Sequence, residues 1–240
     1  MANPTAAMLV IGDEILSGRT RDANMYFLAQ ALTKHGIDLR EARFVSDGKE
    51  EIVLAVNALR AQYDHVVTSG GIGPTHDDIT ADAIAEAFET KIDVRADARE
   101  LLQAHYDRSG QELNDARLRM ARIPDGAILI ENPVSTAPGF TLKNVHVMAG
   151  VPAVFQAMVQ SLLPRLTGGD PVVSKSLRLM KGEGDVAAPL AEIAMRNPTI
   201  SLGSYPFQFE GRYGTNIVAR GTSETDLAAV MDELKKAFVE

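Results

Sequence analysis

A glycine-rich segment at residues 66–80 has the residue types and spacing of a ligand-binding loop. A short apolar run at 66–68 is typical of a buried strand, three glycines and a proline follow, and residues 81–88 have a helical pattern. Glycines let the backbone approach a ligand closely, and the first N–H groups of a helix have no intrahelical partner. The segment therefore fits a phosphate or another anion. A tight turn before a capped helix explains the glycines equally simply, and the glycines alone favour that interpretation.

Two named nucleotide motifs do not fit this segment. A P-loop closes with lysine and serine or threonine, and the segment contains no lysine. A dinucleotide-binding fingerprint needs a third glycine at the position of His76. The adjacent Asp77 and Asp78 would repel a phosphate unless a metal ion or a proton lies between them. These acids make a metal-assisted phosphate site a real alternative to the simple turn.

Acidic residues follow three successive predicted strands. Asp13 and Glu14 follow the first, Asp47 follows the second, and Asp77 and Asp78 follow the third. In an open parallel sheet the carboxyl ends of the strands share one edge, and ligands bind in the crevice beside it. We predict that Asp13, Asp47 and Asp78 face one crevice. Any one of them could instead be an ordinary turn residue or helix N-cap.

His76 is the only histidine in this predicted site. A solvent-exposed loop position, a metal ligand and a phosphate contact all remain open for it. Carboxylates together with substrate phosphates commonly hold Mg²⁺, and a metal so placed polarises a phosphoryl group and activates water. We expect Mg²⁺ or a similar divalent metal, with Asp47, His76, Asp77 and Asp78 as candidate ligands.

The elements that must position these residues alternate between strand and helix over residues 6–88. Such alternation predicts an α/β fold with a parallel sheet covered on both faces. Residues 97–121 break the pattern and suggest two helices around Ser109-Gly110, an excursion over the edge of the sheet. A turn at 123–126, a strand at 127–130, a hairpin at 140–148 and a helix from Pro152 should follow. The predicted strands end near Gly12, Ser46, Ser69 and Glu131.

A linker at 167–171 separates two predicted domains, residues 1–168 and 172–240. The second is a small α+β unit with strands at 172–179, 199–202 and 212–219 and helices at 185–196 and 224–238. An aromatic run at 204–209 suits either base stacking or packing within a hairpin, and the acidic character of the chain favours packing.

The composition limits the possible partners and location. The 240 residues carry a formal net charge of -8, which argues against a general nucleic-acid binder. The absence of cysteine excludes disulfides, zinc–thiolate sites and a cysteine nucleophile. No apolar run reaches transmembrane length and the first five residues are not a signal peptide. We expect a cytoplasmic protein with neither a nucleic-acid nor a membrane partner.

Residues 70–80 closely resemble the signature of the MoaB/Mog-like molybdopterin-binding domain, especially the version in the CinA (competence/damage-inducible protein) family. Gly12-Asp13-Glu14 and Asn24 resemble the opening motif of that family. Ser135 to Gly139 resembles its Gly-Thr-Ala-Pro-Gly loop, with Ser135 in place of glycine. Gly150-Val151-Pro152 resembles a further loop. There, Ala149 replaces a proline and Val154-Phe155 replaces Glu-Met, which affects the ligand contacts of that loop rather than the fold.

The resemblance implies a three-layer, mostly parallel sheet followed by a small domain like the CinA middle domain. It implies functional roles for Asp47 and Asp78 and a phosphorylated small-molecule ligand, a nucleotide or molybdopterin. The implied ligand-binding residues are Gly12, Asp13, Glu14, Asn24, Gly70, Gly71, Gly73, Pro74, Thr75, Thr80, Ser135, Pro138, Gly139, Gly150 and Pro152.

The same resemblance implies an activity. CinA-type domains are associated with metal-dependent hydrolysis of ADP-ribose-like pyrophosphates, which is our first expectation. Adenylylation of molybdopterin, as in Mog-type domains, and a non-catalytic binding module are the alternatives. A homo-oligomer is expected. The nicotinamide-nucleotide deamidase domain of CinA proteins would lie after residue 240, so we expect this chain not to deamidate nicotinamide mononucleotide.

Overall fold

A computed structural model describes residues 3–239 of the chain. The chain forms two compact units, residues 1–169 and 170–240, and each is described by itself. The boundary falls inside the linker expected at 167–171.

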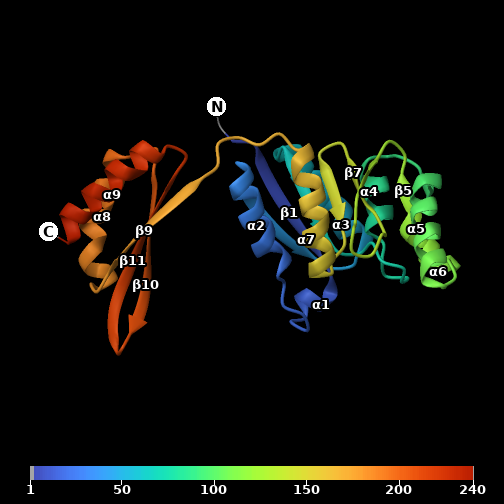
Figure 1. The fold of residues 1–240 in the computed structure, drawn as a ribbon, viewed down its shortest axis with the longest axis horizontal. Coiled ribbons are helices and arrows are strands. Elements are labelled where there is room, and N and C mark those ends of the chain that lie inside the picture. The colour runs from blue at the N-terminus through green and yellow to red at the C-terminus, as the bar shows by residue number, and fades with distance from the viewer. Residues whose placement is uncertain (1–2, 240) are drawn as a thin grey trace. The chain divides into compact units, whose positions relative to one another are not determined.

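The first unit is built on a six-stranded, mostly parallel sheet with the order β2-β1-β3-β8-β7-β6 (Figure 1). The strands are β1 (Thr5–Ile11), β2 (Asp38–Val45), β3 (His65–Ser69), β6 (Ile128–Ile130), β7 (Gly139–Leu142) and β8 (Val145–Met148). Strands β2, β1, β3 and β8 are parallel, and β7 runs antiparallel between β8 and β6. The predicted strand ends and the β7–β8 hairpin are confirmed.

Helices cover both faces of this sheet. On one face, α2 (Asn24–His35) and α7 (Pro152–Leu162) pack through Leu28 and Phe155 against inward residues of β1 such as Met8. On the other face, α3 (Lys49–Gln62), α4 (Thr80–Ala87) and α5 (Ala96–Ser109) bury a second apolar layer. Figure 1 shows α2 and α7 side by side in front of the sheet. The three-layer α/β architecture is confirmed.

The ends of α2 show how local sequence sets these boundaries. The backbone N–H groups of Asn24 and Met25 donate to the carboxylate of Asp22 at 3.3 and 3.1 Å, which satisfies two of the N–H groups that a helix start leaves open. Gly36 ends the helix with φ 73°, a conformation that glycine adopts without a steric penalty.

The excursion at 97–121 differs in part from the prediction. Helix α5 is followed by a single turn, α6 (Asp115–Leu118), and by a 3-10 turn, η1 (Arg119–Ala121). The unpredicted strands β4 (Ile92–Val94) and β5 (Arg122–Pro124) form a separate antiparallel pair, so the expected turn at 123–126 begins inside a strand. The first loop contains another unpredicted turn of helix, α1 (Asp13–Leu16). Segments of three or four residues are too short to show a hydrophobic period.

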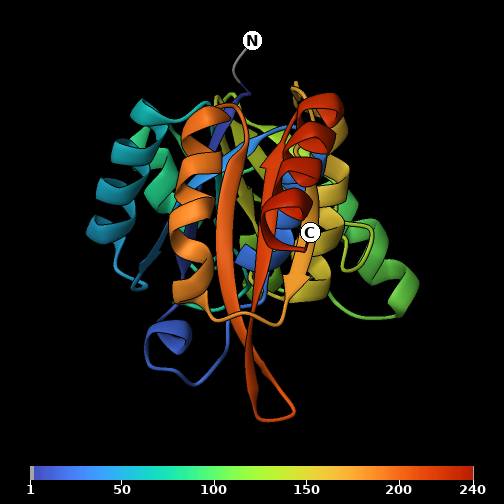
Figure 2. The same cartoon turned by 90° about the vertical axis from the view of Figure 1, so that its left-hand side faces the viewer.

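The second unit packs two helices on one face of a three-stranded antiparallel sheet with the order β10-β11-β9. The elements are β9 (Val173–Leu179), α8 (Glu183–Arg196), β10 (Ser201–Phe209), β11 (Arg212–Gly221) and α9 (Glu224–Phe238). Figure 2 shows both helices in front of the strands and the β10–β11 hairpin extending past the ends of the helices. No described helix combines the length and apolar character that a bilayer crossing requires.

Strand β10 is longer than predicted and contains the whole aromatic run. Pro206 lies inside β10, which is an edge strand, and edge strands are where proline is tolerated in a sheet. Glu210 and Gly211, with φ 48° and 75°, form the turn to β11, and such turns match the twist of the two strands.

Candidate functional site

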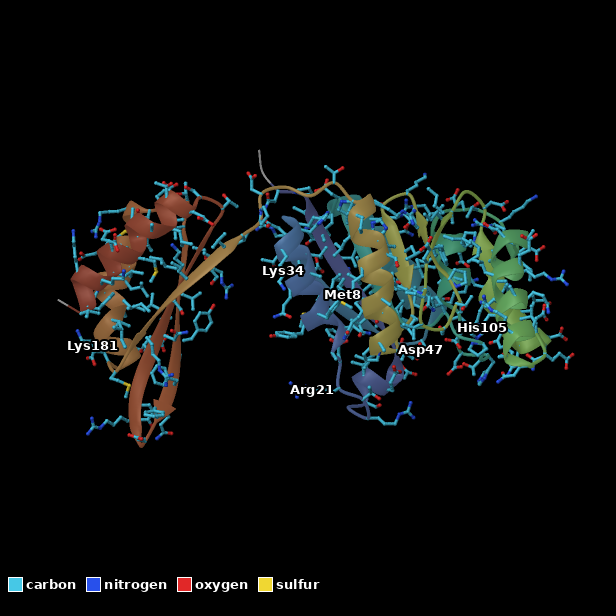
Figure 3. All side chains as sticks on the ribbon, in the orientation of Figure 1. Met8, Arg21, Lys34, Asp47, His105 and Lys181 are labelled. Atoms are coloured by element: carbon cyan, nitrogen blue, oxygen red, sulfur yellow. The ribbon has the colours of Figure 1, made fainter. Side chains whose placement is uncertain are left out.

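A cleft of about 500 Å³ lies at the edge of the sheet where β1, β2, β3, β6 and β8 end. Its wall contains four carboxylate residues and the backbone of Gly70 to Gly73, and no lysine or arginine of the described chain. The acidic members are Glu14, Asp47, Asp77 and Asp78. The topology therefore gathers negative charge beside the glycine loop. Figure 3 shows Asp47 at the end of the sheet nearest α1.

Asp47 and Asp13 have different positions at this edge. Asp47 lines the cleft, and its Oδ2 accepts a hydrogen bond of 2.9 Å from the backbone N–H of Asp13. Asp13 itself is not among the wall residues, and Glu14 takes the place in the cleft that was expected for Asp13. The bond joins the first helical turn after β1 to the end of β2.

Asp78 closes the glycine loop from within. Its Oδ2 accepts from the backbone N–H of Thr75 at 2.8 Å and from the Thr75 hydroxyl at 2.5 Å. A Cβ at Gly73 would lie 2.6 Å from that oxygen, so a side chain there would have to displace the Asp78 carboxylate. The N-cap residue of α4 is Ile79, with no side-chain cap, so Asp78 is not an N-cap. The Thr75 hydroxyl also lowers the pKa of Asp77 and keeps that carboxylate charged.

Thr80 supports the loop from behind. It is fully buried, its hydroxyl donates to the carbonyl of Gly70 at 3.0 Å, and its N–H donates to the carbonyl of Gly71 at 2.9 Å. Gly70 and Gly71 have φ 111° and 70°, and a Cβ at Gly71 would overlap the Thr80 hydroxyl. The geometry gives Thr80 a positioning role and leaves the front of the loop open to the cleft.

Asn24 ties three elements together beneath the cleft. Its buried Nδ2 donates to the Ser69 hydroxyl at 2.8 Å and to the carbonyl of Gly150 at 2.7 Å. These bonds join α2 to the end of β3 and to the loop before α7. Its Oδ1 is buried without a partner among the described residues. Gly150 lies so close to the glycine loop that a Cβ there would be 3.3 Å from the Gly70 Cα.

The loop between β6 and β7 forms another wall, organised by Asn132. The buried Asn132 accepts from the backbone N–H groups of Val134 and Ser135, both at 3.1 Å, and donates to the Ser135 hydroxyl at 2.6 Å and the Ala137 carbonyl at 2.8 Å. Thr136, with φ 66°, contacts His105 Nδ1 of α5 through its hydroxyl at 3.0 Å. Sequence reasoning missed Asn132, although its place directly after a strand, before Pro133, was a usable signal.

Several predicted site residues lie outside the cleft wall. The His76 side chain is fully exposed and 3.9 Å from Asp77. Pro138 borders a small cavity of about 20 Å³ behind the glycine loop, and Gly139 is buried in β7. Other predicted residues absent from the wall are Gly12, Asp13, Asn24, Pro74, Thr75 and Thr80. Those in the wall are Glu14, Asp47, Gly70, Gly71, Gly73, Asp77, Asp78, Ser135, Gly150 and Pro152.

Two arginines behind the loop have different partners. Arg122 forms a two-pronged ion pair with Asp82 at 2.6 and 2.7 Å, which balances its charge. Arg119 donates weakly to the Asp78 carbonyl at 3.4 Å, and its Nε is buried without a partner in the described chain. Thr20, Met120 and Val154 also line the cleft and were not predicted.

The side chains of Val154 and Phe155, both on α7, pack into the apolar layer between this helix and the sheet. Both are buried where the resemblance would place glutamate and methionine. This side of the cleft therefore carries no charge, and the carboxylates are confined to the ends of β1, β2 and β3.

The comparisons with known proteins agree with this geometry. Residues 7–168 match the model of a family described as probable molybdopterin binding domain. The chain belongs to this family. Residues 171–240 match the model of the FAD synthase middle domain. The predicted recognition, a molybdopterin-binding fold of CinA type with a small following domain, is confirmed.

Individual relatives support the same assignment. A solved structure of CinA from Thermoplasma acidophilum, described as of unknown function, is 35% identical, has a TM-score of 0.62, and covers 68% of this chain and 97% of its own. A Pyrobaculum calidifontis protein is 35% identical over 213 residues, 85% of this chain and 81% of that protein. A probable FAD synthase of Caenorhabditis briggsae is 30% identical over 98% of this chain, which spans half of that longer protein.

Proposed function

We propose that the first unit hydrolyses the pyrophosphate bond of an ADP-ribose-like nucleotide with the help of a divalent metal. The observation that carries the proposal is the cleft wall, in which Glu14, Asp47, Asp77 and Asp78 surround the glycine loop without a lysine or arginine. A diphosphate would be repelled by these carboxylates, so it requires a cation bound with it. The cleft volume of about 500 Å³ suits a small-molecule ligand.

The donor set fits a magnesium-like ion. No group of three or more histidine, cysteine or acidic side chains in the described part of the chain is arranged to hold a metal alone. Mg²⁺ is usually held by one or two carboxylates together with waters and substrate phosphates. Asp47 and Asp78 each use Oδ2 in hydrogen bonds, and within residues 3–239 no hydrogen bond engages their Oδ1 atoms. These two carboxylates would hold the ion.

In the proposed reaction the metal ion and the protein have different tasks. A bound ion would polarise a phosphoryl oxygen and lower the pKa of water. The backbone of Gly71 to Gly73 positions the diphosphate, and Thr75 keeps Asp78 in place. The oxygen of water forms a bond to one phosphorus, the bond from that phosphorus to the bridging oxygen breaks, and AMP and ribose 5-phosphate leave.

Binding or adenylylation of molybdopterin is the second candidate. The family model, described as a probable molybdopterin binding domain, matches almost the whole first unit and favours a pterin ligand. Adenylylation consumes ATP and releases inorganic pyrophosphate, whereas hydrolysis of ADP-ribose releases AMP. The products therefore distinguish the two reactions.

The test is a screen of ADP-ribose, FAD and NAD with Mg²⁺, Mn²⁺, Co²⁺ or no metal, with AMP measured by chromatography. We expect the protein to release AMP from ADP-ribose only when a divalent metal is present. EDTA should abolish this release, and added metal should restore it fully. Asp125→Asn, an exposed turn residue remote from the cleft, is the matched control for site variants. Absence of AMP with every metal, together with measurable nucleotide or pterin binding, would favour a non-catalytic module.

A further inference from the structure

Charge is divided between the two layers of the second unit. Strands β9, β10 and β11 contain four basic residues and no acidic residue. Helices α8 and α9 contain seven acidic residues and three basic ones. The basic residues of the strands are Lys175, Arg178, Arg212 and Arg220. The unit therefore presents a basic sheet although the chain as a whole has a net charge of -8.

The register places three aromatic rings on the face of the sheet that the helices leave open. Side chains alternate along a strand, so Tyr205, Phe207 and Phe209 share one face. Ile217 and Ala219 of β11 point the other way, into the core beneath α8 and α9. The cross-strand partners of the three aromatics are Asn216, Gly214 and Arg212, and Asn216 pairs in turn with Arg178 of β9.

Two of these rings, Tyr205 and Phe207, lie directly over glycines of the sheet. A Cβ at Gly214 would overlap the Phe207 ring, and a Cβ at Gly203 would lie 3.1 Å from the Tyr205 ring. The Arg178 guanidinium lies 4.1 Å from the centre of the Phe207 ring and 5.5 Å from that of Phe209. Tyr205 and Phe209 remain 47% and 51% exposed.

We propose that this aromatic face, formed by Tyr205, Phe207, Phe209, Arg178 and Arg220, binds single-stranded nucleic acid. Every base has a π-face that stacks on aromatic rings or on a guanidinium, and the arginines neutralise phosphates. An acidic peptide would use the arginines but would not need the exposed rings of Tyr205 and Phe209. Arg220 donates to the Tyr205 hydroxyl at 3.4 Å, so a charge stands beside the exposed ring.

The net charge of the chain does not oppose this assignment strongly. Exposed charges separated by more than about 8 Å are largely screened at physiological ionic strength. The basic sheet therefore acts on a bound strand more than distant carboxylates do. The proposal is independent of the activity of the cleft in the first unit.

The test uses the full chain and fluorescence anisotropy with labelled 12-nucleotide oligo(U) and oligo(dT) at low salt. Combined Tyr205→Ala and Phe209→Ala should weaken binding of both oligonucleotides at least tenfold, because two rings on which bases can stack are removed. Tyr213→Ala is the matched control. Tyr213 is 72% exposed on the same hairpin, but its register places it on the opposite face, so binding should be unchanged.

Two further variants distinguish a loss of base stacking from a loss of folding and from a loss of charge attraction. Phe209→Leu keeps apolar bulk without a ring and should also weaken binding. Arg220→Gln should reduce the slope of log affinity against log salt by about one. The proposal is overturned if neither oligonucleotide binds at low salt or if Tyr213→Ala weakens binding equally. Equal competition by duplex DNA or by polyglutamate would also overturn it, because either result would mean attraction by charge alone.

Discussion

At the scale of single residues, the two carboxylate oxygens of Asp78 have different surroundings. One oxygen fixes the loop through Thr75, and the other makes no hydrogen bond within residues 3–239, at the edge of a cleft that contains Asp47. Asparagine has one carbonyl oxygen of the same shape, so it can keep the loop and lose only the charge. The residue thus allows the proposed metal role to be tested without breaking the structure.

We predict that Asp78→Asn lowers turnover of ADP-ribose at least a hundredfold and leaves the melting temperature unchanged or raised. The rise would follow because removing one of four neighbouring carboxylates relieves repulsion when no metal is bound. Turnover at saturating Mg²⁺ and melting curves of both proteins check this, with Asp125→Asn treated identically. Equal turnover of wild type and Asp78→Asn would remove Asp78 from the mechanism.

Gly71 gives a second prediction at this scale. Gly71→Ala would overlap the Thr80 hydroxyl and must also keep φ near 70°. Gly18→Ala is the matched control, because Gly18 has φ 73° and open space around it. The control should lose about 1 kcal/mol of unfolding free energy, and Gly71→Ala about 2–4 kcal/mol, since steric strain adds to it. Urea unfolding measures the free energy of unfolding of both variants. Equal losses in Gly71→Ala and Gly18→Ala would mean that the Thr80 side chain moves aside to make room for the new methyl group.

At the scale of elements, β3 and β8 share a histidine pair, a buried His146 and a half-buried His65, at the end of the sheet opposite the cleft. His65 Nδ1 lies 3.2 Å from His146 Nε2, and the Thr141 hydroxyl lies 3.0 Å from His146 Nδ1. Burial, with the nearby His65 and Arg165, lowers the pKa of His146 to about 3. Burial also lowers the pKa of His65. Both side chains are therefore neutral in the folded protein at neutral pH.

We predict that the first unit loses stability as the pH falls below 6.5. The folded-state pKa of His146 lies below its unfolded value, so the unfolded chain binds more protons between about pH 3 and 6.5. From pH 7 to pH 5 the loss due to His146 should be about 2 kcal/mol. Urea unfolding at both pH values measures it, and His146→Gln should reduce the difference. A pH dependence unchanged by His146→Gln would show that other groups cause it.

The strands and helices also show which features of the fold could be predicted from the sequence. Alternating strands and helices predicted where β1, β2, β3 and β6 end, because βα alternation fixes which edge carries the loops. The pairing of β4 with β5 depends on contacts between distant segments, which no local period reveals. Asn132 was missed although its partners Val134, Ser135 and Ala137 follow it closely in the sequence. His76 was a candidate ligand because it lies in a recognisable motif. Its side chain is fully exposed and does not line the cleft.

At the scale of the whole molecule, the two units have separate apolar cores. The core of the second unit is made only of residues from 173 onward, and the two clusters of the first unit contain none of these. Each unit therefore has its own source of stability. The boundary near residue 169 was predictable because the glycines and proline of the linker are visible in the sequence.

We predict two unfolding transitions in calorimetry, of which only one responds to the cleft ligand. ADP-ribose with Mg²⁺ should raise the transition of the first unit, because a ligand stabilises only the unit that binds it. A single-stranded oligonucleotide should raise the other. One cooperative transition that shifts as a whole would show that the units are energetically coupled.

Under the proposed function, the carboxylate-lined wall would make the binding of metal and the binding of nucleotide depend on each other thermodynamically. Mg²⁺ alone meets too few protein ligands to bind tightly, and a diphosphate alone meets repulsion from Asp47 and Asp78. By reciprocity, the factor by which Mg²⁺ tightens nucleotide binding equals the factor by which the nucleotide tightens Mg²⁺ binding. The cleft would then fill only when both are abundant, so its occupancy would report the concentration of the metal–nucleotide complex rather than of either component.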